Sequence, residues 1–376
     1  MKIYFISKDV KNLADKSSGG GKSSETLLKH LVELGTDIKI FNSVSELKSG
    51  IELEKPDVVL HQNVQEMVRT QRICEKRNVP LVVTVNSFIS CCTSMHITDQ
   101  TKYGEPCYKC VFPKCFKCIF SGLKYAYPSI HLQAKDTLLT PAYYAIRGLR
   151  ISALNKADKV ICISPTMKRM IEIAGVNAQK MKVIPQPVDP RFLNPTESDI
   201  FEGFDIAFIS SAHWFKGAHL AAEAVSKLNN IRLVIAGGDT KTGNYIKHIL
   251  ADKAVFVGAL SKDEMRNYYH SAHVVLFPSI WFEGYARSFS EPMMCGKPVV
   301  AFNNGRGATD YLTHEENALI SDFDVDAYAE QIQRLFDDDA LYMRISRNAQ
   351  EYAKKNFLAD VVAKKYEKVF EEVVKR

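Results

Sequence analysis

The sequence has no long run of apolar residues and no long run of basic ones. No stretch approaches the roughly 18 apolar residues that a transmembrane helix requires. The start of the chain, MKIYFIS, lacks the basic and apolar regions of a signal peptide. The net charge of +6 is mild, and no RNA-binding signature accompanies it. We therefore expect a cytoplasmic protein that does not bind nucleic acid. The charge fits an anionic small molecule or a peripheral membrane contact and requires neither.

Short apolar runs alternate with amphipathic stretches in two series. The first series contains KIYFIS, DIKIF, DVVLHQ and VPLVVTVN, and the second runs from FDIAFISS through IRLVIAGG and HVVLFPS to KPVVAFN. Such alternation predicts an α/β fold with parallel sheets covered by helices. A proline-punctuated stretch near residues 186–194 separates the two series. We expect domains at 1–188 and 189–355, and a final helix at 356–376 that packs back on the first domain.

Cysteine is concentrated in one segment of the chain. Six of the nine cysteines lie between Cys91 and Cys118, in a stretch of about 90–140 where the alternation breaks and an insertion is expected. Four of them have the spacing C-x2-C-x4-C-x2-C, namely Cys107, Cys110, Cys115 and Cys118. In a cytosolic protein this spacing indicates a metal before a disulfide. We favour structural zinc, with Cys91 or Cys92 as substitute ligands, over an iron–sulfur cluster. The spacing is also compatible with disulfide bonds or free thiols, and none of these states gives the cluster a catalytic role.

Basic and aromatic residues surround the cysteines. This mixture is typical of a membrane interface or a site for a lipid-linked acceptor, although any loop over a core can contain it. The residues are Lys109, Lys114, Lys117, Lys124, Phe112, Phe116, Phe120, Tyr125 and Tyr127.

The stretch KSSGGGKSSETLLKHL resembles a phosphate-binding loop at first sight. A Walker A motif, G-x-x-x-x-G-K-[ST], would need its first glycine at position 16, which is Lys16, and would follow directly after a strand. The P-loop NTPase interpretation therefore fits poorly. Gly20 and Gly21 still allow backbone N–H groups to approach an anion where a helix begins. The alternative is a flexible connector before Ser23 or Ser24 as the N-cap.

The stretch WFEGYARSFSEPMMCGKPVVA, residues 281–301, is the most informative in the chain. Glu283 and Glu291 are separated by seven residues and followed by a C-G-K-P turn. With SSAHWFKG at 210–217 and the PVDPRF linker, this pattern resembles the large "group 1" family of retaining GT-B glycosyltransferases, which includes glycosyltransferase family 4. The resemblance spans nearly the whole chain. It implies two Rossmann-like doubly wound domains that face a cleft, with the acceptor on the N-terminal side and a nucleotide-diphosphate sugar on the C-terminal side.

The resemblance assigns roles to single residues. Lys216 would neutralise the donor diphosphate, and free N–H groups of Gly284, Tyr285, Ala286 and Arg287 at a helix start would face it. Glu283 would bind hydroxyls of the donor sugar, and Glu291 would bind the ribose. The catalytic set implied is Glu283, Lys216 and Arg287, and the donor-binding set adds Gly20, Gly21 and Asn86.

Three departures from the family pattern affect this assignment. The family usually has an arginine shortly before the KG lysine, where this chain has Ser210 and Ser211, and Arg287 would replace that cation. Ala286 stands where a glycine is usual. Asn86 stands where the family often has a histidine, and an amide can bind a sugar hydroxyl without titrating near neutral pH. His61, at the end of DVVLHQ, either faces a site or is a satisfied strand-end histidine.

The mechanism that the resemblance implies is transfer with retention, in which the leaving diphosphate helps to take the acceptor proton. No catalytic metal is expected in this fold class. The donor would be a UDP- or GDP-linked sugar, and the acceptor a glycan or a lipid-linked intermediate. The alternative from another class is a catalytically inactive GT-B binding protein with a metal-stapled interaction module.

Overall fold

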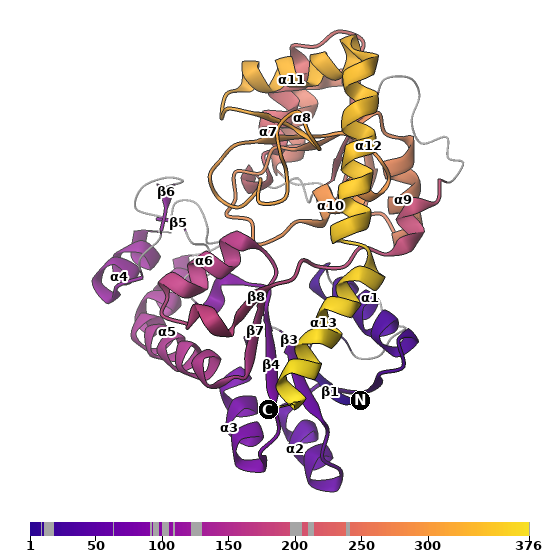
Figure 1. Cartoon of the computed structure of the whole chain (residues 1–376). Coiled ribbons are helices and arrows are strands. Elements are labelled where there is room, and N and C mark those ends of the chain that lie inside the picture. The colour runs from indigo at the N-terminus through magenta and orange to yellow at the C-terminus, as the bar shows by residue number, and fades with distance from the viewer. Residues whose placement is uncertain are drawn as a thin grey trace. The chain divides into compact units, whose positions relative to one another are not determined.

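The computed structural model describes residues 1–8, 10, 19–62, 64–90, 92, 98–99, 105–107, 110–121, 130–195, 205–209, 214–237 and 241–375. The chain divides into two compact units, shown in Figure 1. Unit 1 comprises Met1–Pro187 and Val362–Arg376, and unit 2 comprises Val188–Val361. Each unit is built on one six-stranded parallel sheet, so the predicted α/β architecture is confirmed.

The sheet of unit 1 has the strand order β2-β1-β3-β4-β7-β8. Every residue of β3 and β4 is buried, which explains why these strands are apolar over most of their length rather than alternating. The strands are β1 (Lys2–Ile6), β2 (Asp37–Phe41), β3 (Val58–Gln62), β4 (Leu81–Val85), β7 (Lys159–Cys162) and β8 (Met181–Val183). The helices that accompany them are α1 (Gly19–Glu33), α2 (Val44–Leu53), α3 (Met67–Arg77), α5 (Ile130–Lys156) and α6 (Pro165–Ile173).

Helix α13 (Ala359–Val374) completes the core of unit 1 although it lies at the far end of the sequence. Its apolar residues from Val362 to Val373 pack in one buried cluster with Leu27, Leu28 and Leu31 of α1 and with strands β1 and β3. The Tyr366 hydroxyl also lies 3.2 Å from Thr84 Oγ1 on β4. The expected return of the final helix to the N-terminal half is therefore confirmed.

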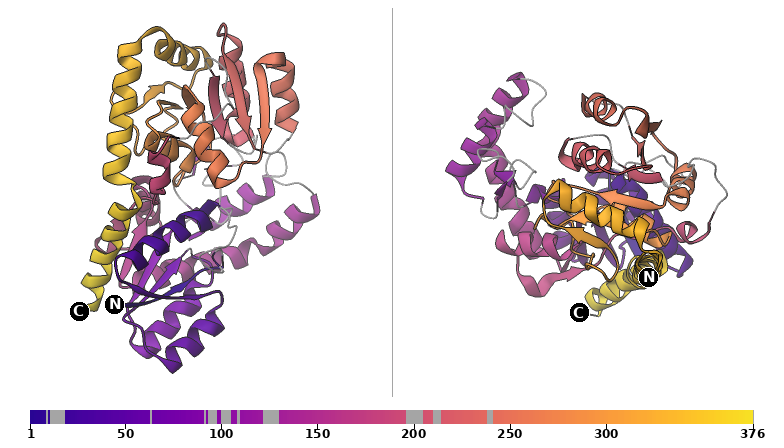
Figure 2. Two further views of the ribbon diagram at one scale, coloured as in Figure 1. Left: turned by 90° about the vertical axis from the view of Figure 1, so that its right-hand side faces the viewer. Right: turned by 90° about the horizontal axis from the view of Figure 1, so that it is seen from above.

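The segment that interrupts the alternation contains helices. A short hairpin, β5 (Thr98–Asp99) and β6 (Glu105–Pro106), is followed by α4 (Phe112–Ser121), which packs beside the 27-residue helix α5. Both views of Figure 2 show the α4–α5 pair extending outward from the body of unit 1. The described part of the predicted insertion is thus mostly helical, in α4 and the start of α5, rather than a loop.

The sheet of unit 2 has the order β11-β10-β9-β12-β13-β14. Two clusters of buried apolar side chains fill this unit. The strands are β9 (Asp205–Ile209), β10 (Arg232–Ala236), β11 (Ala254–Gly258), β12 (Val274–Phe277), β13 (Val299–Phe302) and β14 (Leu319–Ser321). The helices are α7 (Ala218–Ser226), α8 (Lys241–Leu250), α9 (Lys262–Ser271), α10 (Arg287–Met294), α11 (Val325–Asp337) and α12 (Asp339–Asn356).

Strand order reverses once within each sheet. In unit 1 the chain moves from β1 outward to β2 and then returns to β3 on the other side of β1. In unit 2 it moves from β9 outward to β10 and β11 and then returns to β12. In open parallel sheets, ligands bind beyond the carboxyl ends of the strands at such a reversal. The two places to search are therefore the ends of β1 and β3 and the ends of β9 and β12.

Candidate functional site

The reversal in unit 2 brings two of the predicted residues together. Lys216 ends the single 3₁₀ turn Trp214–Lys216, which follows β9 in the chain, and Glu283 lies in the loop between β12 and α10. Lys216 Nζ donates to Glu283 Oε1 over 2.6 Å, and the Ser279 hydroxyl donates to the same oxygen over 2.6 Å. The Glu283 side chain is only 6% exposed, whereas that of Lys216 is 36% exposed. The carboxylate is thus held in place, and the ammonium group still reaches solvent.

Backbone contact between the two loops fixes this pair. Gly217 has a φ of +73° and caps the N-terminus of α7. A Cβ atom at Gly217 would lie 1.9 Å from the carbonyl oxygen of Pro278. No side chain fits there, so the loops after β9 and β12 meet backbone to backbone.

A third segment, after β13, supports the loop that carries Glu283. The Glu283 amide donates to the Arg306 carbonyl over 2.8 Å, and the Arg306 guanidinium donates to the Ile280 carbonyl over 2.7 Å. Asn304 Nδ2 donates to the Ser279 carbonyl over 2.6 Å. Ser279, Asn304 and Arg306 are not among the residues predicted from the sequence. In the sequence they are marked only by position: Ser279 ends the strand segment HVVLFPS, and Asn304 and Arg306 follow the strand segment KPVVAFN.

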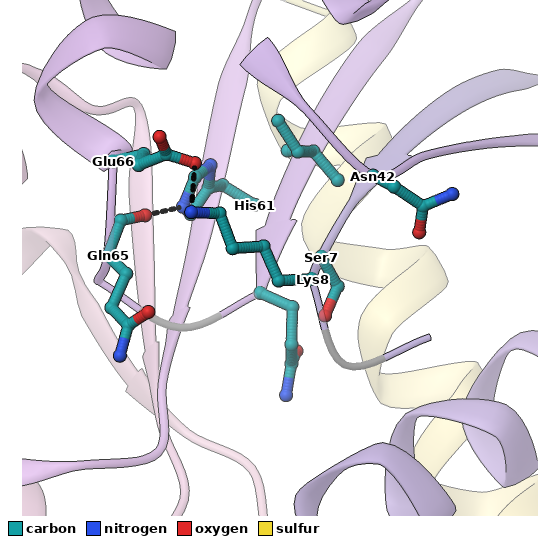
Figure 3. Close-up of a pocket in the computed structure, with 8 residues that line it drawn as sticks. Ser7, Lys8, Asn42, His61, Gln65 and Glu66 are labelled. Carbon is teal, nitrogen blue, oxygen red and sulfur yellow. Dashed lines mark hydrogen bonds and ion pairs between the residues drawn. The ribbon is translucent and has the colours of Figure 1, made fainter. Parts of the chain in front are cut away.

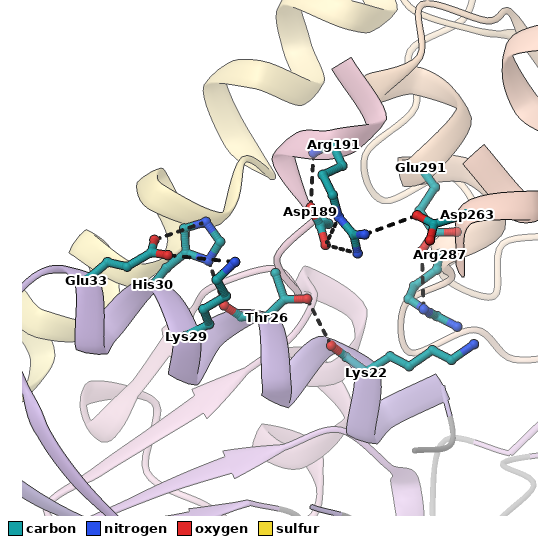
Figure 4. Close-up of polar contacts among 10 residues, drawn as sticks. All are labelled: Lys22, Thr26, Lys29, His30, Glu33, Asp189, Arg191, Asp263, Arg287 and Glu291. Atoms are coloured by element: carbon teal, nitrogen blue, oxygen red, sulfur yellow. Dashed lines mark hydrogen bonds and ion pairs between the residues drawn. The ribbon is translucent and has the colours of Figure 1, made fainter. Parts of the chain in front are cut away.

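Arg287 and Glu291 form a second pair at the start of α10. Arg287 is the first helical residue, and its guanidinium donates to Glu291 Oε1 over 3.2 Å, one turn along the helix (Figure 4). Glu291 is 7% exposed. Ala286 is the N-cap and makes no side-chain capping bond. In this first turn the Phe289 amide donates to the Ala286 carbonyl over 3.5 Å, so the N–H groups of Arg287 and Ser288 are the candidates for anion binding.

Gly284 and Tyr285 precede this helix. Gly284 is half-buried, and the Tyr285 ring packs at centroid distances of 5.2–5.9 Å from the rings of Phe289, Tyr311 and Phe357. The Tyr285 side chain thus anchors the loop in the core of unit 2. Its predicted contribution to donor binding is through the backbone only.

The N-terminal candidates lie at the carboxyl edge of the unit 1 sheet. Helix α1 begins at Gly19, so Gly20 and Gly21 form its first turn and Ser23 and Ser24 lie inside it. The alternative prediction, a flexible connector that ends at Ser23 or Ser24 as the N-cap, is therefore wrong. Figure 4 shows the hydrogen bond from Thr26 Oγ1 to the Lys22 carbonyl in this first part of α1. The remaining glycine interpretation, anion binding at a helix start, stays a prediction.

A Walker A loop is not formed here. Strand β1 ends at Ile6 and α1 begins at Gly19, so the strand and the helix are not joined by the tight loop that this motif uses. The glycines belong to the helix instead of a loop before it.

Asn86 directly follows β4. Its Oδ1 atom is buried and has no hydrogen-bond partner in the described part of the chain. Ser210 and Ser211, which stand where the family has an arginine, lie outside the described residues.

The cysteine quartet does not form a converged site. Cys115 and Cys118 are buried on α4, and Cys107 and Cys110 precede the helix. The Sγ atoms of Cys110 and Cys115 are 2.9 Å apart, which is shorter than the roughly 3.8 Å between two thiolates on one tetrahedral zinc. Among the described residues, no three cysteine sulfur atoms lie within 4.8 Å of one another. Structural zinc and an iron–sulfur cluster both stay predictions without support from this geometry. Cys91 lies outside the described residues.

Two family models together cover most of the chain. The model described as Glycosyltransferase Family 4 matches residues 30–192, and the model described as Glycosyl transferases group 1 matches residues 197–352. The chain belongs to the group 1 family of retaining glycosyltransferases. The resemblance predicted from Lys216, Glu283 and Glu291 is therefore confirmed at the level of the family.

Several curated glycosyltransferases are distant relatives of this chain. An uncharacterized glycosyltransferase of Methanocaldococcus jannaschii is 26% identical over 254 residues, which span 60% of this chain and 63% of that protein. A D-inositol 3-phosphate glycosyltransferase of Acidothermus cellulolyticus is 25% identical over 223 residues, which span 52% of this chain and 49% of that protein. The matched regions thus cover about half to two thirds of these relatives.

Solved structures share the fold over the full length. HepE of Anabaena, crystallised with UDP, has a TM-score of 0.71 at 17% identity and covers 99% of this chain and 100% of its own. Sucrose-phosphate synthase of Thermosynechococcus elongatus has a TM-score of 0.72 at 17% identity and covers 100% of this chain and 99% of its own. These likenesses confirm the predicted GT-B fold. None of the helices in the described ranges is long and apolar enough to cross a bilayer.

Proposed function

We propose that this protein transfers a sugar, with retention of anomeric configuration, from a nucleoside-diphosphate sugar to an acceptor hydroxyl. The observation that carries the proposal is the Lys216–Glu283 pair at the strand-order reversal of unit 2, within the matched group 1 region. A cation and a buried carboxylate side by side suit a ligand that presents a phosphate next to sugar hydroxyls.

The geometry suggests how the pair works. When the donor binds, its diphosphate pairs with the Lys216 ammonium, because Lys216 is the more exposed member of the Lys216–Glu283 pair. Glu283 then accepts hydrogen bonds from hydroxyls of the donor sugar while Ser279 keeps its carboxylate in place. As the bond to the sugar breaks, Lys216 and the N–H groups at the start of α10 stabilise the charge that develops on the leaving phosphate. No catalytic metal is part of this proposal.

The remaining donor contacts follow from position. Arg287 supplies a second cation at the start of α10, and Glu291 accepts hydrogen bonds from the ribose hydroxyls. Gly20, Gly21 and Asn86 are proposed as donor contacts from unit 1. HepE of Anabaena has been crystallised with UDP and with UDP-glucose, so we propose UDP before GDP.

Donor binding is tested by thermal shift with UDP, GDP and ADP. At about a hundredfold excess over Kd, one diphosphate should raise Tm by about 3–8 °C. Glu291→Ala should reduce this rise to about 2 °C or less, because the ribose loses its acceptor. Glu330→Ala, which removes an exposed carboxylate from α11, is the matched control and should respond like the wild type.

The same samples decide between an enzyme and an inactive binding protein. Release of UDP from UDP-sugars, by transfer or slow hydrolysis, supports the enzyme. Tight UDP binding without any turnover of UDP-glucose, UDP-galactose or UDP-N-acetylglucosamine would favour the non-catalytic alternative. No stabilisation by any diphosphate would contradict the donor site itself.

We propose that the acceptor is a glycan or a lipid-linked intermediate and that α4 touches an anionic membrane surface. Phe112, Phe116 and Phe120 are spaced four residues apart on α4 and are 39%, 42% and 59% exposed. Lys117, on the same helix, is exposed too. Exposed aromatic residues next to lysines suit the interface of an anionic bilayer. Of the surrounding residues in the sequence prediction, Lys109, Lys124, Tyr125 and Tyr127 lie outside the described residues.

Vesicle co-sedimentation tests the membrane contact. The wild type should bind phosphatidylglycerol vesicles more tightly than phosphatidylcholine vesicles, with binding that weakens as salt rises. Phe116→Ser with Phe120→Ser should weaken binding at least tenfold. Leu53→Ser removes a side chain that is 89% exposed on α2 and should leave binding unchanged. Equal binding by all three proteins would exclude α4 as the contact.

A further inference from the structure

Two regions of unit 1 differ in how their side chains are used. At the carboxyl edge of the sheet, polar side chains bond within the unit. Figure 3 shows Lys8 Nζ reaching Glu66 Oε2 over 3.1 Å, and His61 Nε2 lying 2.9 Å from the Gln65 carbonyl oxygen. Helix α5, which extends outward with α4 in Figure 2, instead keeps a continuous row of apolar side chains in contact with solvent. Such a row is typical of a surface that packs against another molecule.

The exposed side of α5 between Leu138 and Leu149 carries no charge. The structure describes every residue of this range, and eight of them are exposed, each apolar or a glycine. They are Leu138, Leu139, Pro141, Ala142, Ala145, Ile146, Gly148 and Leu149, and we call them the α5 face. The two neighbouring arginines make contacts within the chain. Arg147 lies over the Tyr144 ring, 5.8 Å from its centroid, and Arg150 donates to the Ile89 carbonyl over 3.2 Å.

The centre of the α5 face has the spacing of a helix–helix seam. Leu138, Ala142, Ala145 and Leu149 follow one another at intervals of four, three and four residues. This period of 3.5 residues keeps them in line along a neighbouring helix. The order is the same from either end of the seam, with leucine outside and alanine inside. A seam that is alike in both directions fits an antiparallel copy of itself.

The antiparallel arrangement pairs residues of equal size. About a two-fold axis between Ala142 and Ala145, Leu138 meets the partner's Leu149 at both ends of the seam. Ala142 meets the partner's Ala145 on both sides of the axis. The alanines let the two helices approach to about 8 Å, because the distance between helix axes depends on the side chains at the contact.

The flanks of the seam fit the same arrangement. In an antiparallel pair each flank meets its own counterpart, so Leu139 packs on the partner's Ile146, and Pro141 packs on the partner's Gly148. A two-fold symmetric contact brings the same surface of both copies together, so any charge on that surface lies near its own copy. The α5 face has no charge and is therefore free of this repulsion.

The attachment of α5 to unit 1 favours the antiparallel arrangement over a parallel one. The C-terminal end of the helix is bound to the body of the unit: Asn155 Nδ2 donates to the Gly175 carbonyl over 2.9 Å, and Lys156 pairs with Glu75 over 3.0 Å. A parallel pair would place both bodies at the same end of the seam. An antiparallel pair places them at opposite ends and also sets the helix dipoles in opposite directions.

The area of the α5 face is enough for a weak dimer. Its large residues Leu138, Leu139, Ile146 and Leu149 are 81%, 36%, 40% and 49% exposed. With the smaller residues between them, the face offers on the order of 500 Å² per protomer, so a symmetric contact buries about 1,000 Å² in total, the lower limit for a specific interface. We expect association in the micromolar range rather than an obligate dimer.

We propose that the α5 face binds a second copy of this chain, antiparallel and about a two-fold axis between Ala142 and Ala145. The proposal does not depend on the transferase function. A lipid surface suits the α5 face less well, because the face contains none of the aromatic and basic residues that suit an anionic bilayer and that α4 presents.

Charged substitutions across the seam test this pairing. Leu138→Glu puts a carboxylate against the partner's Leu149, and Leu149→Lys puts an ammonium group against the partner's Leu138. Each should weaken dimerisation by about tenfold or more, because the charge loses water and gains no partner. With both substitutions in one chain, each carboxylate lies beside the partner's ammonium, and the Kd should return to within about threefold of the wild type.

The double variant reports on contacts between copies only. Eleven residues of helix, about 16 Å, separate the two positions, so the introduced charges cannot pair within one chain. In a parallel pair, the same double variant would bring carboxylate to carboxylate and ammonium to ammonium, and would associate more weakly than either single variant. Recovery in the double variant is therefore specific to the antiparallel arrangement.

Sedimentation velocity of the full chain over a range of concentrations gives the Kd for each protein. Thermal unfolding followed by circular dichroism should give similar Tm values for all of them, because the substituted residues are exposed. Leu53→Glu is the matched control. It adds a carboxylate at a residue of α2 that is 89% exposed, and it should dimerise like the wild type.

Four results would overturn the proposal. A wild type that stays monomeric through the micromolar range has no such contact. Single variants that dimerise like the wild type would place the interface elsewhere. A double variant that associates no better than the single ones would exclude the antiparallel pairing. A monomeric wild type whose binding to phosphatidylglycerol vesicles is weakened by Leu138→Glu would assign the α5 face to a bilayer.

Discussion

Gly217→Ala should prevent unit 2 from folding normally. The new Cβ would lie 1.9 Å from the Pro278 carbonyl oxygen, and the φ of +73° is itself unfavourable for alanine. Backbone atoms on both sides cannot move without displacing Lys216 and the loop that carries Glu283. We expect a loss of more than about 4 kcal/mol in the free energy of unfolding, or insoluble protein, because severe overlap at a special φ belongs to the largest single-residue effects. Chemical denaturation or soluble yield measures it.

Gly258→Ala is the matched control for that substitution. Gly258, at the end of β11, has the same φ of +73°, but a Cβ there meets nothing within 4 Å. It should lose only the conformational term, about 1–2 kcal/mol. Equal losses in the two variants would show that the close approach to Pro278 does not matter.

Lys216→Met should be the most damaging change to catalysis that leaves the chain folded. The transferase rate should fall about 100- to 1,000-fold, because a cation aimed at the leaving phosphate is removed. The variant should also lose about 1–3 kcal/mol of stability, since Glu283 is then a buried carboxylate with only the Ser279 hydroxyl shown as a side-chain partner. This expected loss of stability is smaller than for two fully buried charges, because the lysine is partly exposed to solvent.

Adding Glu283→Gln to Lys216→Met separates the two effects. The neutral amide removes the buried charge, so stability should return to within about 1 kcal/mol of the wild type. Activity should stay low, because neither the cation nor the carboxylate is restored. A double variant as unstable as Lys216→Met would contradict this account of the pair.

Lys182→Met is the matched control for Lys216→Met. Lys182 is 36% exposed, as Lys216 is, but its partner Glu372 is 44% exposed instead of buried. Both stability and activity should be nearly unchanged. A rate within tenfold of the wild type in Lys216→Met would exclude the lysine from the donor site.

The sequence predicted the fold because its strands are short, apolar and regularly spaced, and a parallel sheet leaves little choice for such segments. Lys216, Glu283, Arg287 and Glu291 could be named as candidates because they lie within two continuous stretches; the structure pairs them two by two, and their roles toward a donor stay predictions. The residues at which the helices begin were harder to predict from the sequence. A run of three glycines is unfavourable in a helix, so a helix start at Ser23 or Ser24 stood as an alternative, but packing of Leu27, Leu28 and Leu31 overrides that preference.

The supporting residues could not be predicted in the same way. Asn304 and Arg306 act through bonds to backbone carbonyls of residues 25 and 26 positions away. Such bonds depend on which loops the sheet brings together and leave no local pattern. Likewise, the spacing of the cysteines suggested two similar knuckles, whereas the second C-x-x-C lies on α4, where helical geometry sets the directions of its side chains.

The discontinuity of unit 1 affects the order in which the protein can fold during synthesis. The surface of α1 and of β1 and β3 that α13 covers in the finished protein stays without that cover until Val362–Val373 have been made. The whole of unit 2, about 175 residues, lies between Pro187 and those residues. At 5–20 residues per second, the ribosome needs about 10–35 s to synthesise it. Unit 2 is contiguous and can fold within that interval. The first unit to be synthesised is therefore the last to be completed.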